Sequence, residues 1–219
     1  MSGERQRQTV AASVSQRADN AEGQRGRAGG ARARIRRHAE RARDAQAAEA
    51  ILRAGRVAHV AFSDGSGQPY VLPFTYAYED GCLYLHGARA SRTVRLLRAG
   101  TPVCVEVTLL DGLVASRAAK SHSMNYRSVV VFGTADAVAD EAVKRAIFER
   151  MTVRYFPDRR AGRDYTPARA GELRAVELLA VRVEELSAKV RSGPPLGPHD
   201  AEDEAVGSRF VVLLPGVDV

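Results

Sequence analysis

A junction between a predicted strand and a predicted helix, at residues 86–92, carries residue types that bind phosphate. His86 and Gly87 end the strand, and Ser91 and Arg92 lie in the first turn of a helix predicted to begin at about Arg89. Free N–H groups at the start of a helix attract phosphate, and a guanidinium can add a bidentate contact. A serine hydroxyl can donate a further hydrogen bond. An ordinary helix cap has the same spacing, so the junction alone does not establish a phosphate site.

A second polar cluster stands directly before an apolar run. Tyr126, Arg127 and Ser128 precede residues 129–133, which are Val-Val-Val-Phe-Gly. Polar residues are unusual where a buried strand begins and are natural at the edge of a binding site. The alternative is a solvated loop that merely precedes a strand.

Two cations, Lys189 and Arg191, end the last predicted strand. Together they could neutralise a phosphate, and an ordinary surface pair is the simpler interpretation. His86 could act as an acid, as a haem ligand or as a packing residue. The five histidines are scattered with no pair at i, i+4, which argues against a dedicated metal site.

The elements that must position these residues are mostly strands. Alternating apolar residues and turn sequences predict strands at 57–62, 70–78, 82–86, 103–110, 126–138 and 175–185. Helices are predicted at 31–53, 89–98 and 140–154, and Asp111-Gly112 is predicted to turn the chain. Pro73 cannot donate to a ladder, so one side of its strand should be unpaired or bulged there. Antiparallel hairpins with helices between them favour a mainly β fold with flanking helices, in a small closed or nearly closed antiparallel barrel.

The basic charge of the chain is confined to its beginning. The net charge is +7, but residues 1–45 hold 11 arginines against five acidic residues, and the other 174 residues hold 22 cations against 21 acids. Residues 1–45 are therefore predicted to be a basic, largely disordered arm that runs into a helix. Residues 46–192 form the predicted domain, and residues 193–219 a tail. The near-neutral domain carries no nucleic-acid recognition motif, which argues against a specific nucleic-acid binder.

Cysteine content and hydropathy indicate the compartment. Cys82 and Cys104 form no CxxC pair, and no run of 18 apolar residues exists. We therefore expect a reduced, cytoplasmic protein with no membrane span.

Four segments, in this order, resemble the pyridoxamine 5′-phosphate oxidase-like proteins, and within them the branch that includes nitroimidazole-resistance proteins. These segments are residues 67–74, 83–87, 126–133 and 188–191. The resemblance spans about residues 46–192. It implies a six-stranded antiparallel split β-barrel of the FMN-binding type, a homodimer, and a flavin in a groove shared by the two subunits. The substrate-phosphate residues of the vitamin-making oxidases have no match, which argues against oxidation of pyridoxine phosphate.

The resemblance also implies roles for individual residues. The backbone of Pro73, Phe74, Thr75 and Tyr76 would face the isoalloxazine ring. His86, Gly87, Ser91 and Arg92 would lie toward the ribityl phosphate or the reactive face of the flavin, with His86 as the candidate catalytic residue. Tyr126, Arg127 and Ser128 would complete the groove near the dimer seam, and Lys189 and Arg191 would approach it from the last strand.

Flavin performs its own redox chemistry while the protein supplies position and charge, so the reaction is harder to read than the fold. The leading hypothesis is an FMN-dependent oxidoreductase that acts on a small organic compound, with NADH or NADPH as a possible hydride donor. The alternatives are a non-catalytic flavin- or haem-binding protein and a reductase that uses the deazaflavin F420.

Overall fold

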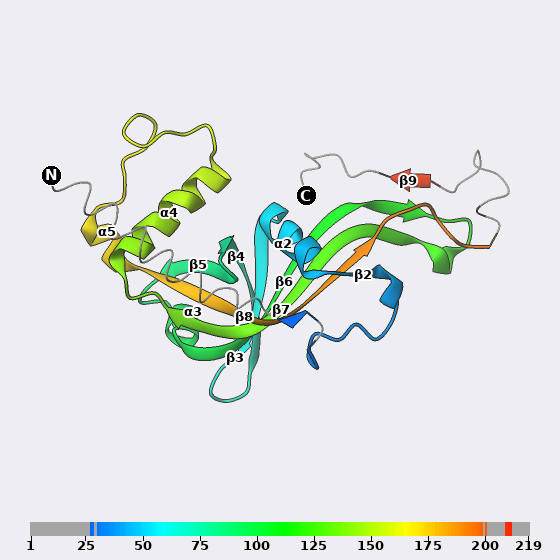
Figure 1. Ribbon diagram of the computed structural model, residues 1–219, viewed down its shortest axis with the longest axis horizontal. Helices are drawn as coiled ribbons and strands as arrows, with labels where there is room; N and C mark the ends of the chain where they lie inside the picture. Colours follow the sequence, from blue (N-terminus) through cyan, green and yellow to red (C-terminus); the bar gives the residue numbers. More distant parts are fainter. Residues whose placement is uncertain (1–26, 29, 199, 201–208, 212–219) are drawn as a thin grey trace.

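The computed structural model describes residues 27–28, 30–198, 200 and 209–211 (Figure 1). The strands are β1 (Arg27–Ala28), β2 (Ala42–Arg43), β3 (Val57–Ser63), β4 (Pro69–Glu79), β5 (Cys82–Ala88), β6 (Ala99–Ala115), β7 (Ser123–Ala137), β8 (Val176–Arg191) and β9 (Arg209–Val211). The α-helices are α2 (Ala45–Ala54), α3 (Arg92–Leu97), α4 (Glu141–Tyr155) and α5 (Ala170–Ala175), and η1 (Ala39–Arg41) and η2 (Ala119–Ser121) are 3₁₀ turns.

Six strands pair in a closed ring. The sheet runs β8-β5-β4-β3-β6-β7, and β7 pairs with β8 to close it. All six pairings are antiparallel. The mainly β fold and the split-barrel architecture expected from the sequence are therefore confirmed.

Three strands of the ring continue beyond it. β6, β7 and β8 extend together into an arm, which lies at the opposite end of the molecule from α4 (Figure 1). The predicted turn at Asp111-Gly112 is wrong, because the strand continues there through a β-bulge between Leu110 and Gly112. A bulge absorbs one extra residue without ending the strand, so turn-forming residues do not distinguish the two outcomes.

The predicted helix at 31–53 is correct only in its second half. α2 begins after Asp44, whose side chain accepts from Ala47 N at 2.8 Å, and it buries Ile51 and Leu52. Before it, residues 30–43 lie along β8: β2 pairs with Ala188 and Lys189, and Arg32 contacts Glu185 at 2.8 Å. Residues 31–43 favour a helix by composition, but their pairing with β8 and the ion pairs with Glu185 and Glu184 hold them in an extended course.

Inward-facing residues of the six strands form the core with α2 and α3. Gly133 of β7 makes one close approach possible: a Cβ there would lie 1.9 Å from the carbonyl oxygen of Arg182. This position coincides with a register shift between β7 and β8. The glycine that ends the motif at 126–133 is thus required by the closure of the ring.

The helices that the structure describes include none that is both long and apolar enough to cross a membrane.

Candidate functional site

The ring is split between β4 and β5. Residues 69–75 of β4 pair only with β3, and residues 76–79 pair with β5. Beyond the pair Tyr76–Leu85 the two strands part, so Thr75 and His86 are the first residues on either side of the gap. Pro73 pairs with β3 alone, as its lack of an N–H predicted. The predicted residues 73–76 and 86–87 therefore both lie at the split between β4 and β5.

A pocket of about 650 Å³, which we call the main pocket, opens at this split. Thr75 and His86 form one side, α4 and α5 form another, and residues 165–168 close it. Aromatic and aliphatic side chains predominate, and they include Phe148, Met151, Tyr155, Phe156, Tyr165, Leu173 and Val176. The size and lining are typical of a site for a small organic molecule.

His86 is the exceptional polar group of the main pocket. Its Nδ1 atom is buried and has no hydrogen-bond partner among the described residues. The ring of Phe148 stands nearly perpendicular to the imidazole, with centroids 5.4 Å apart. Burial lowers the pKa of His86 below its ordinary value. The imidazole is therefore neutral at neutral pH, and its buried Nδ1 atom is left without a polar partner among the described residues.

Tyr155 links α4 to the split. Its hydroxyl accepts from Tyr76 N at 2.9 Å and lies 3.0 Å from Tyr76 O and 2.7 Å from Arg56 O. The side chain of Tyr76 is fully buried and donates to Leu52 O at 2.5 Å, and burial raises its pKa to about 12. The side chain of Tyr76 therefore belongs to the core, and only its backbone lies at the split.

Gly87 and Ser91 fix the helix α3 against β5. A Cβ on Gly87 would lie 2.8 Å from the side chain of Val94, so glycine allows the helix to approach the strand. The Ser91 hydroxyl accepts from Val94 N at 3.2 Å and caps α3. The predicted phosphate role of these residues stays a prediction, and the capping role is present in the structure.

Arg92 is held by the β3–β4 hairpin. Its guanidinium lies 2.8 Å from Asp64 Oδ2, donates to the hydroxyl of Tyr70 and stacks over that ring at 4.8 Å. Hydrogen bonds, first of all from Ser66, lower the pKa of Asp64 to about 2, so the carboxylate is charged at neutral pH. A phosphate that binds Arg92 must share or displace this contact.

The remaining predicted residues lie together on the arm. Tyr126 is opposite Arg191, and Ser128 is opposite Lys189. Arg127 holds Asp111 of the β6 bulge with oxygens at 2.6 to 3.1 Å, which raises the pKa of the guanidinium.

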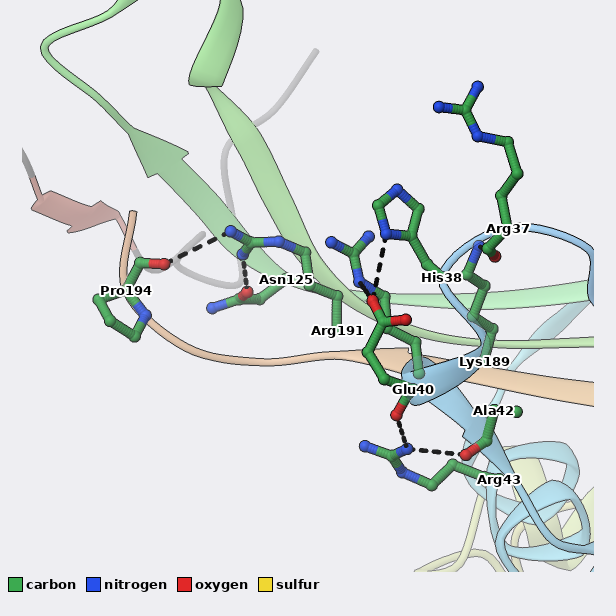
Figure 2. A network of polar contacts seen from close by, with 10 residues as sticks. Arg37, His38, Glu40, Ala42, Arg43, Asn125, Lys189, Arg191 and Pro194 are labelled. Atoms are coloured by element: carbon green, nitrogen blue, oxygen red, sulfur yellow. Dashed lines mark hydrogen bonds and ion pairs between the residues drawn. The ribbon is translucent and has the colours of Figure 1, made fainter. Parts of the chain in front are cut away.

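The two cations that end β8 are engaged by neutral groups. Figure 2 shows Lys189 directed at Arg37, whose carbonyl oxygen it reaches at 3.3 Å. Arg191 turns instead to Asn125 and to Pro194 O, at 3.4 Å from the latter (Figure 2). Burial, followed by the neighbouring charge of Arg41, lowers the pKa of Arg191.

Within one chain, the predicted residues near the split and the predicted residues on the arm lie far apart. On β8, His86 is opposite Leu178 and Ser128 is opposite Lys189. These two positions are separated by roughly 35 Å of strand at about 3.3 Å per residue. A single ligand at the split therefore cannot contact Lys189 of the same chain.

Sequence reasoning missed the wall that α4 and α5 contribute. On α4, Val143, Ile147 and Met151 repeat at the spacing of a core face, and Ile147 and Met151 are indeed buried. Phe148, Thr152 and Tyr155 lie beside that face and line the main pocket. The aromatic rings of Phe148 and Tyr155 were the available signal, but aromatic residues do not separate a pocket from a core.

The family is established by comparison with known proteins. A family model described as pyridoxamine 5′-phosphate oxidase matches residues 44–190. The chain belongs to this family, as the four segments of resemblance indicated.

Two solved structures have sequences at least 30% identical to this chain over the aligned residues. The flavocytochrome Anf3 from Azotobacter vinelandii is 31% identical, with a TM-score of 0.75, over 86% of this chain and 87% of its own. The FAD and heme binding protein from Mycobacterium smegmatis is 30% identical, with a TM-score of 0.66, over 77% of this chain and 85% of its own.

A third structure belongs to the branch named from the sequence. A candidate 5-nitroimidazole antibiotic resistance protein from Bacteroides thetaiotaomicron is 26% identical, with a TM-score of 0.55, over 67% of this chain and 84% of its own. A search of curated proteins gave no match.

Proposed function

We propose that this protein is a flavin-binding redox protein whose isoalloxazine ring lies along β4 at the split. The observation that carries this proposal is the parting of β4 and β5 after the pair Tyr76–Leu85. It leaves the β5-facing edge of residues 73–75 without a partner strand, beside the main pocket. Backbone N–H and C=O groups on such an edge can bind the polar edge of a flavin. Flavin supplies hydride and electron transfer, and the chain supplies position and charge.

The flavin proposal is tested by titration at the split. Thr75→Trp places a large ring at the mouth of the main pocket and should abolish the quenching of flavin fluorescence. Val153→Trp is the matched control and should bind as the wild type does, because Val153 is exposed on α4 and does not line the main pocket. Equal binding by both variants would contradict this location.

The identity of the flavin is a separate question. The sequence resemblance predicts FMN, and the relative from Mycobacterium smegmatis is described as binding FAD. Chromatography of the cofactor released by heat distinguishes the two nucleotides. We propose that the bound flavin oxidises or reduces a small organic compound in the cytoplasm, and consumption of NADH or NADPH in the presence of an acceptor tests the enzymatic part.

A second function, haem binding, is favoured by His86. The residues fit the group: a neutral imidazole with an unpartnered nitrogen lies in a pocket walled by Phe148, Met151 and Phe156. Both relatives at 30% identity or more are described as a flavocytochrome or as a FAD and heme binding protein. We infer that His86 binds the iron of a haem and that the apolar walls exclude water from it.

Haem binding is tested by titration of the cofactor-free protein with haemin. His86→Ala should lose the intense Soret band that the wild type develops. His59→Ala is the matched control, because His59 is exposed on β3, pairs with Glu106 at 3.5 Å and does not line the main pocket. Similar Soret bands in all three proteins would contradict ligation by His86.

We propose that a second copy of the chain completes the flavin site. The two groups of predicted residues are too far apart to meet within one chain, so Lys189 and Arg127 would come from the partner. The outer face of the β3–β4 hairpin carries exposed apolar side chains beside the polar His59, with Val57 42% and Val71 63% exposed, and it adjoins Thr75. Burial of this face is the driving force for dimerisation.

Sedimentation should give about twice the chain mass of 23.7 kDa. Val71→Asp should yield monomers that have also lost flavin. A monomer that retains flavin tightly would contradict the shared site.

A further inference from the structure

A second pocket, of about 330 Å³, is lined by the residues that follow β5 and α3, by the end of β7, and by α4, α5 and the start of β8. We call it the basic pocket. It shares only Leu173 with the main pocket, and it includes none of the residues that the sequence predicted for the flavin. Its charged lining consists of four cations, Arg89, Arg98, Lys144 and Arg174, and two carboxylates, Glu141 and Glu177.

Lys144 provides the main argument. This residue is buried, with 7% of its surface exposed, and its ammonium group donates to the carbonyl oxygen of Val176. Among the described residues no carboxylate oxygen lies within 4.0 Å of it. A buried charge that contacts only a neutral carbonyl is costly to desolvate, so an anion close to it would be strongly favoured.

The other charges of the basic pocket leave positive charge in excess. Glu177 is also buried, and Arg89 neutralises it at 3.4 Å. Arg98 and Arg174 are exposed and make no side-chain hydrogen bond or ion pair with any described residue. Two free guanidinium groups at the rim and one buried ammonium therefore face the same small volume against the one remaining carboxylate, that of Glu141. The positive excess that remains would match a compact anion with two charges.

We propose that the basic pocket binds a phosphate or pyrophosphate group, held by Lys144 inside and by Arg98 and Arg174 at the rim. The site is separate from the main pocket and does not depend on which cofactor occupies the split. The group can come from a free or substrate-borne phosphate, or from the phosphates of the flavin nucleotide.

The test is calorimetric titration of the full-length protein with inorganic pyrophosphate, at constant ionic strength, with and without flavin. Each charge-assisted contact is worth roughly 1.5–3 kcal/mol, so Arg98→Gln and Arg174→Gln should each weaken binding by about tenfold or more. Lys144→Met should abolish it. Because this variant also removes a buried charge, its thermal unfolding is measured with and without pyrophosphate, and only the wild type should be stabilised by the ligand.

Arg95→Gln is the matched control, because it removes the same charge from the same helix outside the basic pocket. It should bind pyrophosphate as the wild type does. Binding by the flavin-loaded protein assigns the site to a free or substrate-borne phosphate. Binding that flavin abolishes, together with weaker flavin retention in Arg98→Gln, assigns it to the cofactor. No binding in either state, or equal weakening by Arg95→Gln, overturns the proposal.

Discussion

Removing the hydroxyl group of Tyr155 should destabilise the split and not merely alter the pocket surface. In Tyr155→Phe the N–H of Tyr76 loses its acceptor at 2.9 Å, and the carbonyl of Arg56 loses a donor at 2.7 Å. Both backbone groups lie where β4 leaves β3 and joins β5, so the ladder offers no replacement partner for the N–H.

The expected cost follows from these lost contacts. A polar group left unsatisfied costs roughly 1–3 kcal/mol, so we expect about 2 kcal/mol of lost unfolding free energy. That corresponds to a fall in melting temperature of about 4–8 °C for a chain of this size. The assay is urea unfolding followed by circular dichroism, in which the midpoint should fall by about 1 M at an unchanged slope.

Tyr165→Phe is the matched control. Tyr165 lines the same pocket, and its hydroxyl has no hydrogen-bond partner among the described residues. Its removal should therefore change stability by less than about 0.5 kcal/mol. If the two variants unfold at the same urea concentration, Tyr155 does not join α4 to the split in the way described.

Two further changes address the cofactor side of the site. Arg92→Ala should weaken FMN by about tenfold to a hundredfold and leave riboflavin, which lacks the phosphate, unchanged; equal losses in equilibrium titrations would assign Arg92 to its contact with Asp64 alone. The pKa of His86 is lowered in the folded protein. As pH falls below 6.5, the unfolded chain therefore binds a proton at His86 more readily than the folded chain does, which destabilises the folded state. The cofactor-free wild type should therefore lose more stability between about pH 7 and about pH 5 than His86→Gln does, and parallel pH profiles would refute this.

Much of the fold could be predicted because its signals are local. The strand β4 and the helix α4 follow from period-two and period-3.6 patterns. Asp140 caps α4 by accepting from Ala142 N and Val143 N, as its residue type favours. The length of β6 could not be predicted in this way. Asp111 and Gly112 are turn residues, and whether they make a turn or a bulge depends on the pairing with β7.

The structure brings Thr75 and His86 to one pocket, and the resemblance covers both strands that carry them. Their roles toward a cofactor stay predictions. The engagement of Arg92 by Asp64 could not be foreseen, since it depends on how the β3–β4 hairpin folds over α3. The distance between His86 and Lys189 could not be foreseen either, because it depends on the full length of β8.

The absorption spectrum of the full-length protein, reconstituted with flavin and haemin and freed of excess ligand, tests the central claim most directly. The wild type should show the two flavin bands in the blue and near ultraviolet together with an intense Soret band. His86→Ala should keep the flavin bands and lose the Soret band. A wild-type protein that retains neither chromophore would contradict the assignment of the split as a flavin site and of His86 as a haem ligand.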